Sequence, residues 1–234
     1  MNIIDIVFLV ILISSILYGF YRGSVASLWG LAAAVAAYPL TLLISPYVAS
    51  WLGANQSIME LLATYTDANA LVGDYTLATT AVQGISFSAL QAVINSLQLP
   101  GIILSILESN MTGCVFASSG LVTVNDYVAY TIVAVSLKAV CFVCTYVLCS
   151  TALHFVINLI NHVFRFPVLK LFDGLVGGLL GALRGILLLY VLSLLIPVIL
   201  TVIPVNLVKT LFDQSTLAGV FTSTGFFVRV VTGS

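Results

Sequence analysis

Four stretches of this chain are each apolar for about the length that a helix needs to cross a lipid bilayer. They lie at residues 3–21, at 25–44, within 127–160 and within 175–203. The hydrocarbon core of a bilayer is about 30 Å thick, and about 20 apolar residues in an α-helix cross it. The sequence therefore predicts an all-α polytopic membrane protein with four transmembrane helices.

The scarcity of charge supports this fold class. Of the 234 residues, 61% are hydrophobic and 6% are charged, whereas soluble domains carry about 25% charged residues. So few charges cannot cover a water-facing surface, and lipid must cover much of the chain. The formal net charge is -1, and the seven Lys and Arg residues are spread over the whole length. This distribution excludes a nucleic-acid-binding protein.

The first apolar stretch is expected to remain as a membrane span. No basic residue precedes it, and Arg22 follows it, which is the opposite charge order to that of a secretory signal peptide. The linker to the second stretch is only a few residues around Arg22 and Gly23. The first two spans are therefore predicted to form an antiparallel hairpin.

Basic residues of the short loops predict the orientation of the chain. Arg22 lies in the first loop, Arg165 and Lys170 lie before the last span, and no Lys or Arg occurs between Gly23 and Leu137. Because short cytoplasmic loops carry the excess of Lys and Arg, we expect these two loops inside. The N-terminus, the segment 46–125 and the C-terminus are then extracytoplasmic. The acidic residues of the middle region agree with this: Glu60, Asp67, Asp74, Glu108 and Asp126.

The chain divides into four predicted parts: a transmembrane hairpin (1–45), an extracytoplasmic helical insertion (46–125), spans three and four (126–203) and an interfacial tail (204–234). In the insertion, apolar residues at helical spacing between Val82 and Leu97 predict an amphipathic helix. Shorter helical pieces are expected at 58–62 and at 102–107, the second entered through Pro100 and Gly101. These pieces either lie on the outer membrane surface, cap the bundle, or form a hairpin that dips into the membrane.

Two ionisable residues near membrane depth have alternative interpretations. Asp5 either stabilises the N-terminus of the first helix at the outer interface, which we favour, or pairs with a buried ion. Lys138 lies near mid-membrane if the third span begins at 127, and is an outer-boundary anchor if it begins at 139. Residues 139–160 are long enough to cross the membrane, so we favour the anchor.

A glycine-rich segment precedes the last apolar run. Gly174, Gly177, Gly181 and Gly185 recur every three or four residues, and on a helix they form a ridge that a neighbouring backbone can approach closely. The segment is either the inner half of a long fourth span, with Arg184 inside the bilayer, or a separate helix at the inner face. Asp173 is three helical turns from Arg184, too far for direct pairing.

No pattern in the sequence predicts catalysis, a metal site or a cofactor. There is no nucleophile–base group, phosphate-binding loop or pair of catalytic carboxylates. A pair of histidines near the inner end is more often structural than a proton relay, which applies to His154 and His162. The cysteines are expected to be core thiols, without zinc spacing or a disulfide framework: Cys114, Cys141, Cys144 and Cys149.

Two motifs resemble the bacterial colicin V production protein family. Asp5, followed by Tyr18-Gly-Phe-Tyr-Arg22-Gly23, is similar to the opening of that family, and Asp173…Gly177…Gly181-Ala-Leu-Arg184-Gly185 is similar to its second signature. The resemblance covers residues 1–45 and 155–200. Two departures are Gly174, where the family often has a basic residue, and an outer segment longer than in typical members. The signature positions carried over are Asp5, Gly19, Arg22, Gly23, Asp173, Gly177, Gly181, Arg184 and Gly185.

The resemblance implies a non-enzymatic, multi-pass inner-membrane protein that supports toxin production or export, or envelope homeostasis. Its expected partners are the lipid bilayer and membrane proteins, either further copies of the chain or other proteins. An alternative is a channel or transporter subunit in which Asp5, Lys138 and Arg184 line a polar path. Charges along a hydrated path would favour this alternative, and charges confined to the two interfaces would count against it.

Overall fold

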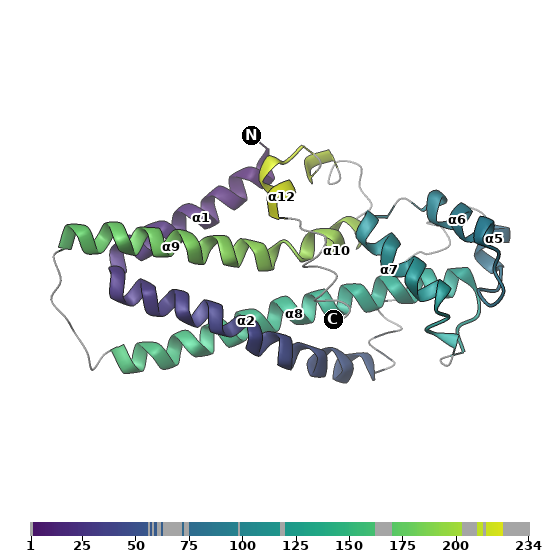
Figure 1. The fold of residues 1–234 in the computed structure, drawn as a ribbon, viewed down its shortest axis with the longest axis horizontal. Coiled ribbons are helices and arrows are strands. Elements are labelled where there is room, and N and C mark those ends of the chain that lie inside the picture. Colours follow the sequence, from purple (N-terminus) through teal and green to yellow (C-terminus); the bar gives the residue numbers. More distant parts are fainter. Residues whose placement is uncertain are drawn as a thin grey trace.

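The computed structural model describes residues 2–55, 75–97, 99–117, 120–161, 170–202, 210–212 and 214–221, with the single residues 57, 59, 62 and 72. Four helical stretches within them are long and apolar enough to cross a membrane: Ile3–Arg22, Ser24–Gly53, Val124–Leu159 and Asp173–Thr201. The protein is therefore an all-α polytopic membrane protein, as the sequence predicts. The helices, shown in Figure 1, are α1 (Ile3–Arg22), α2 (Ser24–Gly53), α5 (Tyr75–Thr79), α6 (Phe87–Ser96), α7 (Gly101–Thr112), α8 (Val124–Asn161), α9 (Lys170–Leu192), α10 (Leu195–Val202) and α12 (Thr216–Phe221).

A single residue, Gly23, joins α1 to α2. Its φ of +82° lies in the left-handed region that favours glycine, and its N–H donates to the Gly19 carbonyl. The predicted hairpin turn is therefore present, but the two helices diverge from it (Figure 1). Helix α1 packs mainly on α9, and α2 packs on α8 and α9. We call the end of the bundle that contains Gly23 the hairpin end.

Residues without bulky side chains line the contact between α1 and α9. A Cβ atom built on Gly177 would collide with the Gly19 carbonyl oxygen, and one built on Gly181 would collide with the Ser15 carbonyl oxygen. The Ser15 hydroxyl also donates to the Gly181 carbonyl at 2.7 Å. The predicted close approach of backbones is thus observed. The glycine segment is the half of a long fourth span nearest the hairpin end, and the alternative of a separate helix at the face is wrong.

The fourth span is not continuous, because a turn at residues 193–194 separates α9 from α10. Pro197 has no N–H to donate, and its ring would clash with the carbonyl four residues earlier in a regular helix. That residue, Ser193, donates its hydroxyl to the carbonyls of Tyr190 at 2.7 Å and Phe221 at 2.9 Å. The break is thereby attached to the end of α12. Most of the predicted interfacial tail, including residues 203–209 and 222–234, lies outside the described residues.

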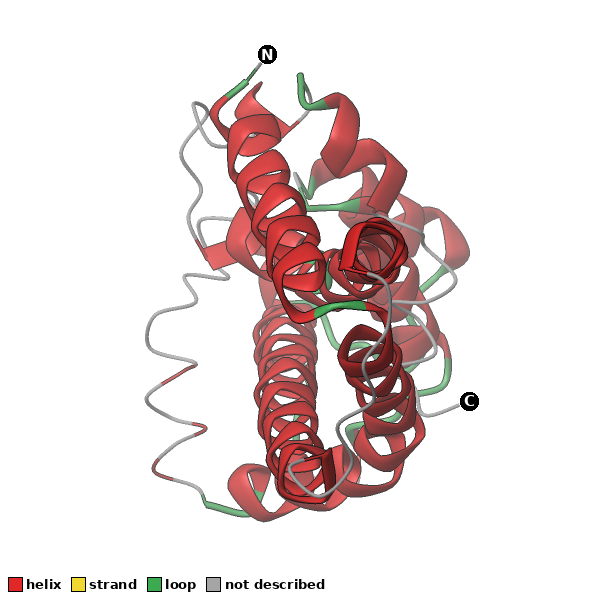
Figure 2. Ribbon diagram, turned by 90° about the vertical axis from the view of Figure 1, so that its left-hand side faces the viewer, coloured by secondary structure: helices red, strands yellow, loops and turns green. Residues whose placement is uncertain are grey.

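Helix α8 is longer than a bilayer is thick. Its 38 residues extend over about 57 Å. Around its N-terminal half pack the described residues of the outer segment, which together we call the cap (residues 75–97, 99–117 and 120–123; Figure 1). Figure 2, turned by 90°, shows the described segments as helices joined by loops. The contact is apolar and buried, and it includes Val93, Ile103, Leu107, Val128 and Ile132. The outer segment therefore covers one end of the bundle, which is one of the arrangements considered from its sequence.

The predicted amphipathic helix in the cap is shorter than its apolar pattern. Residues 82–86 are not helical because Val82 donates its N–H to the Val122 carbonyl at 2.9 Å, and Ser86 accepts from the Ala89 N–H as the N-cap of α6. The expected piece at 102–107 lies inside α7, with Pro100 at its N-cap. The piece at 58–62 is mostly outside the described residues.

Large apolar side chains face outward from the long helices, where acyl chains would surround them. Leu43, Leu148 and Leu179 are 68%, 70% and 66% exposed. Aromatic residues mark two levels along the bundle: Tyr21 at the hairpin end, and Tyr47 with Trp51 near the other end of α2, all largely exposed. Such aromatic belts are typical of the two membrane–water interfaces.

Candidate functional site at the hairpin end

Asp173 joins the first turn of α9 to the start of α2. Its Oδ1 accepts the Ser24 N–H at 2.7 Å and also the Ser24 hydroxyl. The first N–H groups of a helix lack intrahelical partners and attract negative charge, so this carboxylate caps α2 from another helix. A Cβ built on Gly23 would collide with the same carboxylate. Two signature residues distant in sequence, Gly23 and Asp173, are therefore in direct contact.

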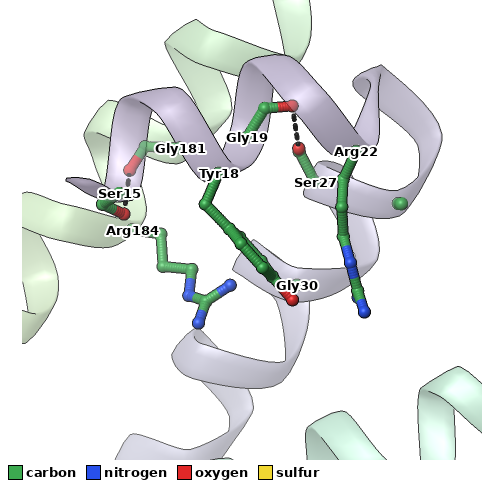
Figure 3. Close-up of a pocket in the computed structure, with 9 residues that line it drawn as sticks. Ser15, Tyr18, Gly19, Arg22, Ser27, Gly30, Gly181 and Arg184 are labelled. Atoms are coloured by element: carbon green, nitrogen blue, oxygen red, sulfur yellow. Dashed lines mark hydrogen bonds between the residues drawn. The ribbon is translucent and has the colours of Figure 1, made fainter. Parts of the chain in front are cut away.

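Next to this contact, an open pocket lies between α1, α2 and α9 (Figure 3). Two arginines of the pocket lining flank one aromatic ring: the Cζ atoms of Arg22 and Arg184 are 5.0 and 5.4 Å from the centroid of the Tyr18 ring. At these distances a guanidinium is attracted to the face of a tyrosine ring. Figure 3 shows Tyr18 between the two arginine side chains, with Gly30 of α2 beside them. The Tyr18 ring thus contacts two positively charged side chains.

Arg184 lies within a span, but the direction of α9 brings its charge toward the hairpin end. The Cα–Cβ bonds of a helix tilt toward its N-terminus, and α9 begins at the hairpin end. The long side chain therefore extends back to Tyr18, as arginines do when they snorkel toward an interface. The other seven residues that line the pocket carry no charge. Some of them have a structural role; the Ser27 hydroxyl, for example, donates to the Gly19 carbonyl at 3.0 Å. The charge of the pocket comes from the arginines.

Helix α8 contributes a third nitrogen-bearing side chain. His154 Nδ1 lies 2.6 Å from the Ser150 carbonyl oxygen, and its buried Nε2 has no hydrogen-bond partner. A Cβ built on Gly30 would lie 3.5 Å from both His154 Nε2 and Arg184 Nη1. The missing side chain at Gly30 therefore leaves a space bordered by these two nitrogens. On the same helix, Asn158 accepts from Arg22 Nη1 at 2.9 Å.

Asp5, another signature residue, lies far from the arginines at the opposite end of α1. It is 7% exposed. Its carboxylate accepts from the Asn2 N–H at 3.2 Å in a capping box, and from the Ser215 hydroxyl at 2.7 Å and the Leu217 N–H at 3.2 Å. Phe8 and Phe221 pack beside it with ring centroids 5.7 Å apart. Asp5 therefore fixes both the start of α1 and the start of α12.

Lys138 is remote from both clusters. It is exposed and lies 20 residues before Asn158 on α8, which corresponds to about 30 Å along the helix axis. Its neighbour Leu137 faces Gly53, the last residue of α2, at 3.7 Å from a Cβ built there. Lys138 is thus one bilayer thickness away from the level of Asn158.

The remaining sequence candidates add packing to the site and no chemistry to it. Gly185 faces Ser15, where a Cβ would lie 3.0 Å from the Ser15 Cβ. The cysteines are free thiols, and no metal-binding group of His, Cys, Asp or Glu occurs among the described residues. His162 and Arg165 lie outside them. Sequence reasoning found Arg22 and Arg184 but missed Tyr18 and Gly30 as parts of the pocket.

A family model described as "Colicin V production protein" matches residues 4–126 and 101–226 of the chain. The two matched stretches overlap and include the outer segment, about which the motif resemblance said nothing. Comparisons with curated proteins and with solved structures found no match. Because the family model covers nearly the whole chain, this multi-pass membrane protein belongs to the colicin V production protein family.

Proposed function

We propose that this protein is a non-enzymatic component of the bacterial inner membrane that supports toxin production or export, or envelope homeostasis, through membrane partners. Family membership gives the membrane setting and the link to colicin V production. The observation that carries the proposal is the position of the described charges, which lie near the two ends of the bundle.

This distribution of charge favours a partner-binding protein over a channel subunit. Arg22, Arg184 and Asp173 gather at the hairpin end, Asp5 lies at the other end of α1, and Lys138 is about 30 Å from Asn158. Between these levels, α1 and α9 meet backbone to backbone, and α2 contributes small buried residues to the bundle: Ala33, Ala34 and Ala37. In the described part of the bundle, the charges do not line one continuous route.

The cap offers a surface for partners outside the membrane. Tyr75 and Phe87 are 80% and 74% exposed on its short helices α5 and α6. Exposed aromatic residues are enriched where proteins bind one another. Deleting the cap would uncover Val128 and Ile132 of α8, so substitutions of exposed residues on the surface of the cap are the better test.

The test is complementation of a strain that lacks this protein. The variant Y75S/F87S should accumulate to the wild-type level yet release less toxin or show greater detergent sensitivity, and cross-linked partners should be lost. The matched control is Val122→Ser, which removes an apolar side chain that is also exposed in the cap region. Ion or solute flux through liposomes that contain only the purified wild-type protein would support the channel alternative and contradict the proposal.

We also propose that the hairpin end faces the cytoplasm, so that the N-terminus and the cap are extracytoplasmic. Arg22 at that end and the basic residues of the predicted Arg165–Lys170 loop support this orientation. On the same assignment, Lys138 is a boundary residue of the outer leaflet, in agreement with its distance from Asn158.

A further inference from the structure

We infer that the pocket between Arg22 and Arg184 binds a phosphate group, carried either by a membrane phospholipid or by a soluble phosphate compound. This inference goes beyond the proposed function and does not depend on any role in export. It assigns a ligand to the place where, among the residues that the structure describes, α1, α2, α8 and α9 bring cationic and nitrogen-bearing side chains together.

The first argument is uncompensated positive charge. The acidic residues of the described chain have other partners: Asp173 is bound by Ser24, Asp5 by Ser215 and Leu217, Glu108 by Gln91, and Asp126 by Thr123. None of these contacts involves Arg22 or Arg184: both arginines contact the Tyr18 ring, and Arg22 also donates to Asn158. A guanidinium at membrane depth is costly unless it is paired or hydrated, and a bound anion would provide the pairing.

The second argument is the kind of anion that these groups fit. A guanidinium presents donors in a rigid fork that matches two oxygens of a phosphate. Two such forks are held beside Tyr18, and a tetrahedral group with several oxygens can accept from more than one donor at once. A small spherical anion such as chloride offers one centre and cannot match two forks.

The third argument is the space at Gly30. Arg184 Nη1 and His154 Nε2 border the volume that a side chain at this position would fill, and Nε2 has no partner within the protein. A protonated imidazole would donate to a phosphate oxygen from Nε2, and a neutral one would accept from the hydroxyl of a phosphate monoester. A phosphate oxygen that reaches this space would therefore also satisfy the buried nitrogen.

The fourth argument is access. Tyr18 is 44% exposed and Arg22 is exposed, so the pocket opens at the surface of the bundle. Arg22 is the last residue of α1 and the exposed Tyr21 precedes it, which places the opening near one membrane interface. Basic pockets between transmembrane helices at this level bind lipid phosphates.

The experiment uses the full-length protein, delipidated in a neutral detergent. Native mass spectrometry compares binding of dioleoylphosphatidylglycerol with that of dioleoylglycerol, which has the same acyl chains and no phosphate, and thermal unfolding is followed with inorganic phosphate against chloride at equal ionic strength. We expect the wild type to prefer one phosphate ligand by about tenfold, as hydrogen bonds to charged groups allow. Arg184→Gln should remove most of this preference. The control Lys138→Gln, which changes a remote cation, should keep it.

The two arms distinguish the source of the phosphate. A preference for the anionic lipid alone identifies a headgroup site, and stabilisation by inorganic phosphate alone identifies a soluble ligand. Gly30→Val retains both arginines but fills the space beside His154 Nε2, and it should weaken binding as well. The inference is overturned if the wild type prefers neither ligand, or if Arg184→Gln or Gly30→Val binds like Lys138→Gln. If a variant fails to fold, the preference of the wild-type protein for a phosphate ligand still tests the inference.

Discussion

Adjacent glycines of α9 have different surroundings, which allows a sharp test of the α1–α9 contact. Gly177→Ala should lower the free energy of unfolding by about 1–3 kcal/mol, the usual cost of overpacking. The reason is that the new Cβ would meet the backbone of Gly19 and Gly23, which no side-chain rotation can relieve. Unfolding in mixed micelles with increasing dodecyl sulfate would measure the difference.

Gly178→Ala is the matched control. Its Cβ would lie 3.8 Å from side-chain atoms of Ile16 and Phe20, an ordinary contact distance. Alanine favours a helix over glycine by about 1 kcal/mol, so this variant should be unchanged or slightly more stable. Equal destabilisation by the two substitutions would show that the ridge is not the basis of the packing.

A second prediction concerns the link between the two ends of the described chain. Asp5→Ala removes the acceptor of the Ser215 hydroxyl and of the Leu217 N–H. Helix α12 should then separate from α1 more often, and limited proteolysis should cleave the chain near residues 214–221 several times faster. Gln214→Ala, at an exposed neighbouring position, should leave the cleavage rate unchanged. An unchanged rate in Asp5→Ala would rule out this role.

At the residue scale, the periodic spacing of residues predicted which positions lie on one helix face, but it did not predict which residues they contact. The spacing of Gly177 and Gly181 was sufficient to predict a bare helix face. That Asp173 would bind Ser24 was not predictable, because the contact joins residues separated by 149 positions. The same holds for Gly30, which is one of several small residues at helical spacing on α2 and becomes informative only when Arg184 and His154 are seen beside it.

At the element scale, α8 has two environments along its length. If residues near Asn158 lie at one interface, then Lys138 lies at the other and residues 124–137 project beyond the bilayer. In a variant that lacks the four native cysteines, Lys138→Cys should react with a membrane-impermeant maleimide, since its side chain is exposed. Leu148→Cys, which is 70% exposed but ten residues deeper, should remain unlabelled. Labelling at both positions, or at neither, would contradict this placement.

The bounds of elements were predicted less well than their existence. The long apolar runs were sufficient to identify the four spans. The end of α9 at Leu192 was missed although Pro197 was a usable signal, because proline disrupts the helical turn before it. The start of α6 was missed because the bridge between Ala81 and Thr123 depends on a segment more than 40 residues away, which no local pattern contains.

At the scale of the whole molecule, the orientation proposal predicts the compartment of each loop. An alkaline phosphatase inserted after Gly84 should be active, because that glycine has open space around it and belongs to the cap. The same enzyme inserted next to Arg165 should be inactive, since phosphatase folds only outside the cytoplasm, where its disulfides form. The reverse pattern would invert the proposed orientation and leave the fold unchanged.

The arrangement of the spans was the part that sequence could not supply. A one-residue linker indicated that α1 and α2 would be neighbours, yet α1 has its main contact with α9. The hydropathy of a helix indicates that the helix is buried in lipid or protein. It does not indicate which other helix packs against it. The choice is made by shape, through Gly19 and Ser15 fitting against Gly177 and Gly181.

This pairing has a consequence for biogenesis. Ribosomes add about 5–20 residues per second, so the residues around Gly181 follow those around Gly19 by about 8–30 seconds. Throughout that interval α1 resides in the membrane without the helix that completes it, and its polar serine hydroxyls and bare backbone face lipid or an insertion factor. The newly made hairpin is thus an assembly intermediate, whose lifetime is set by translation.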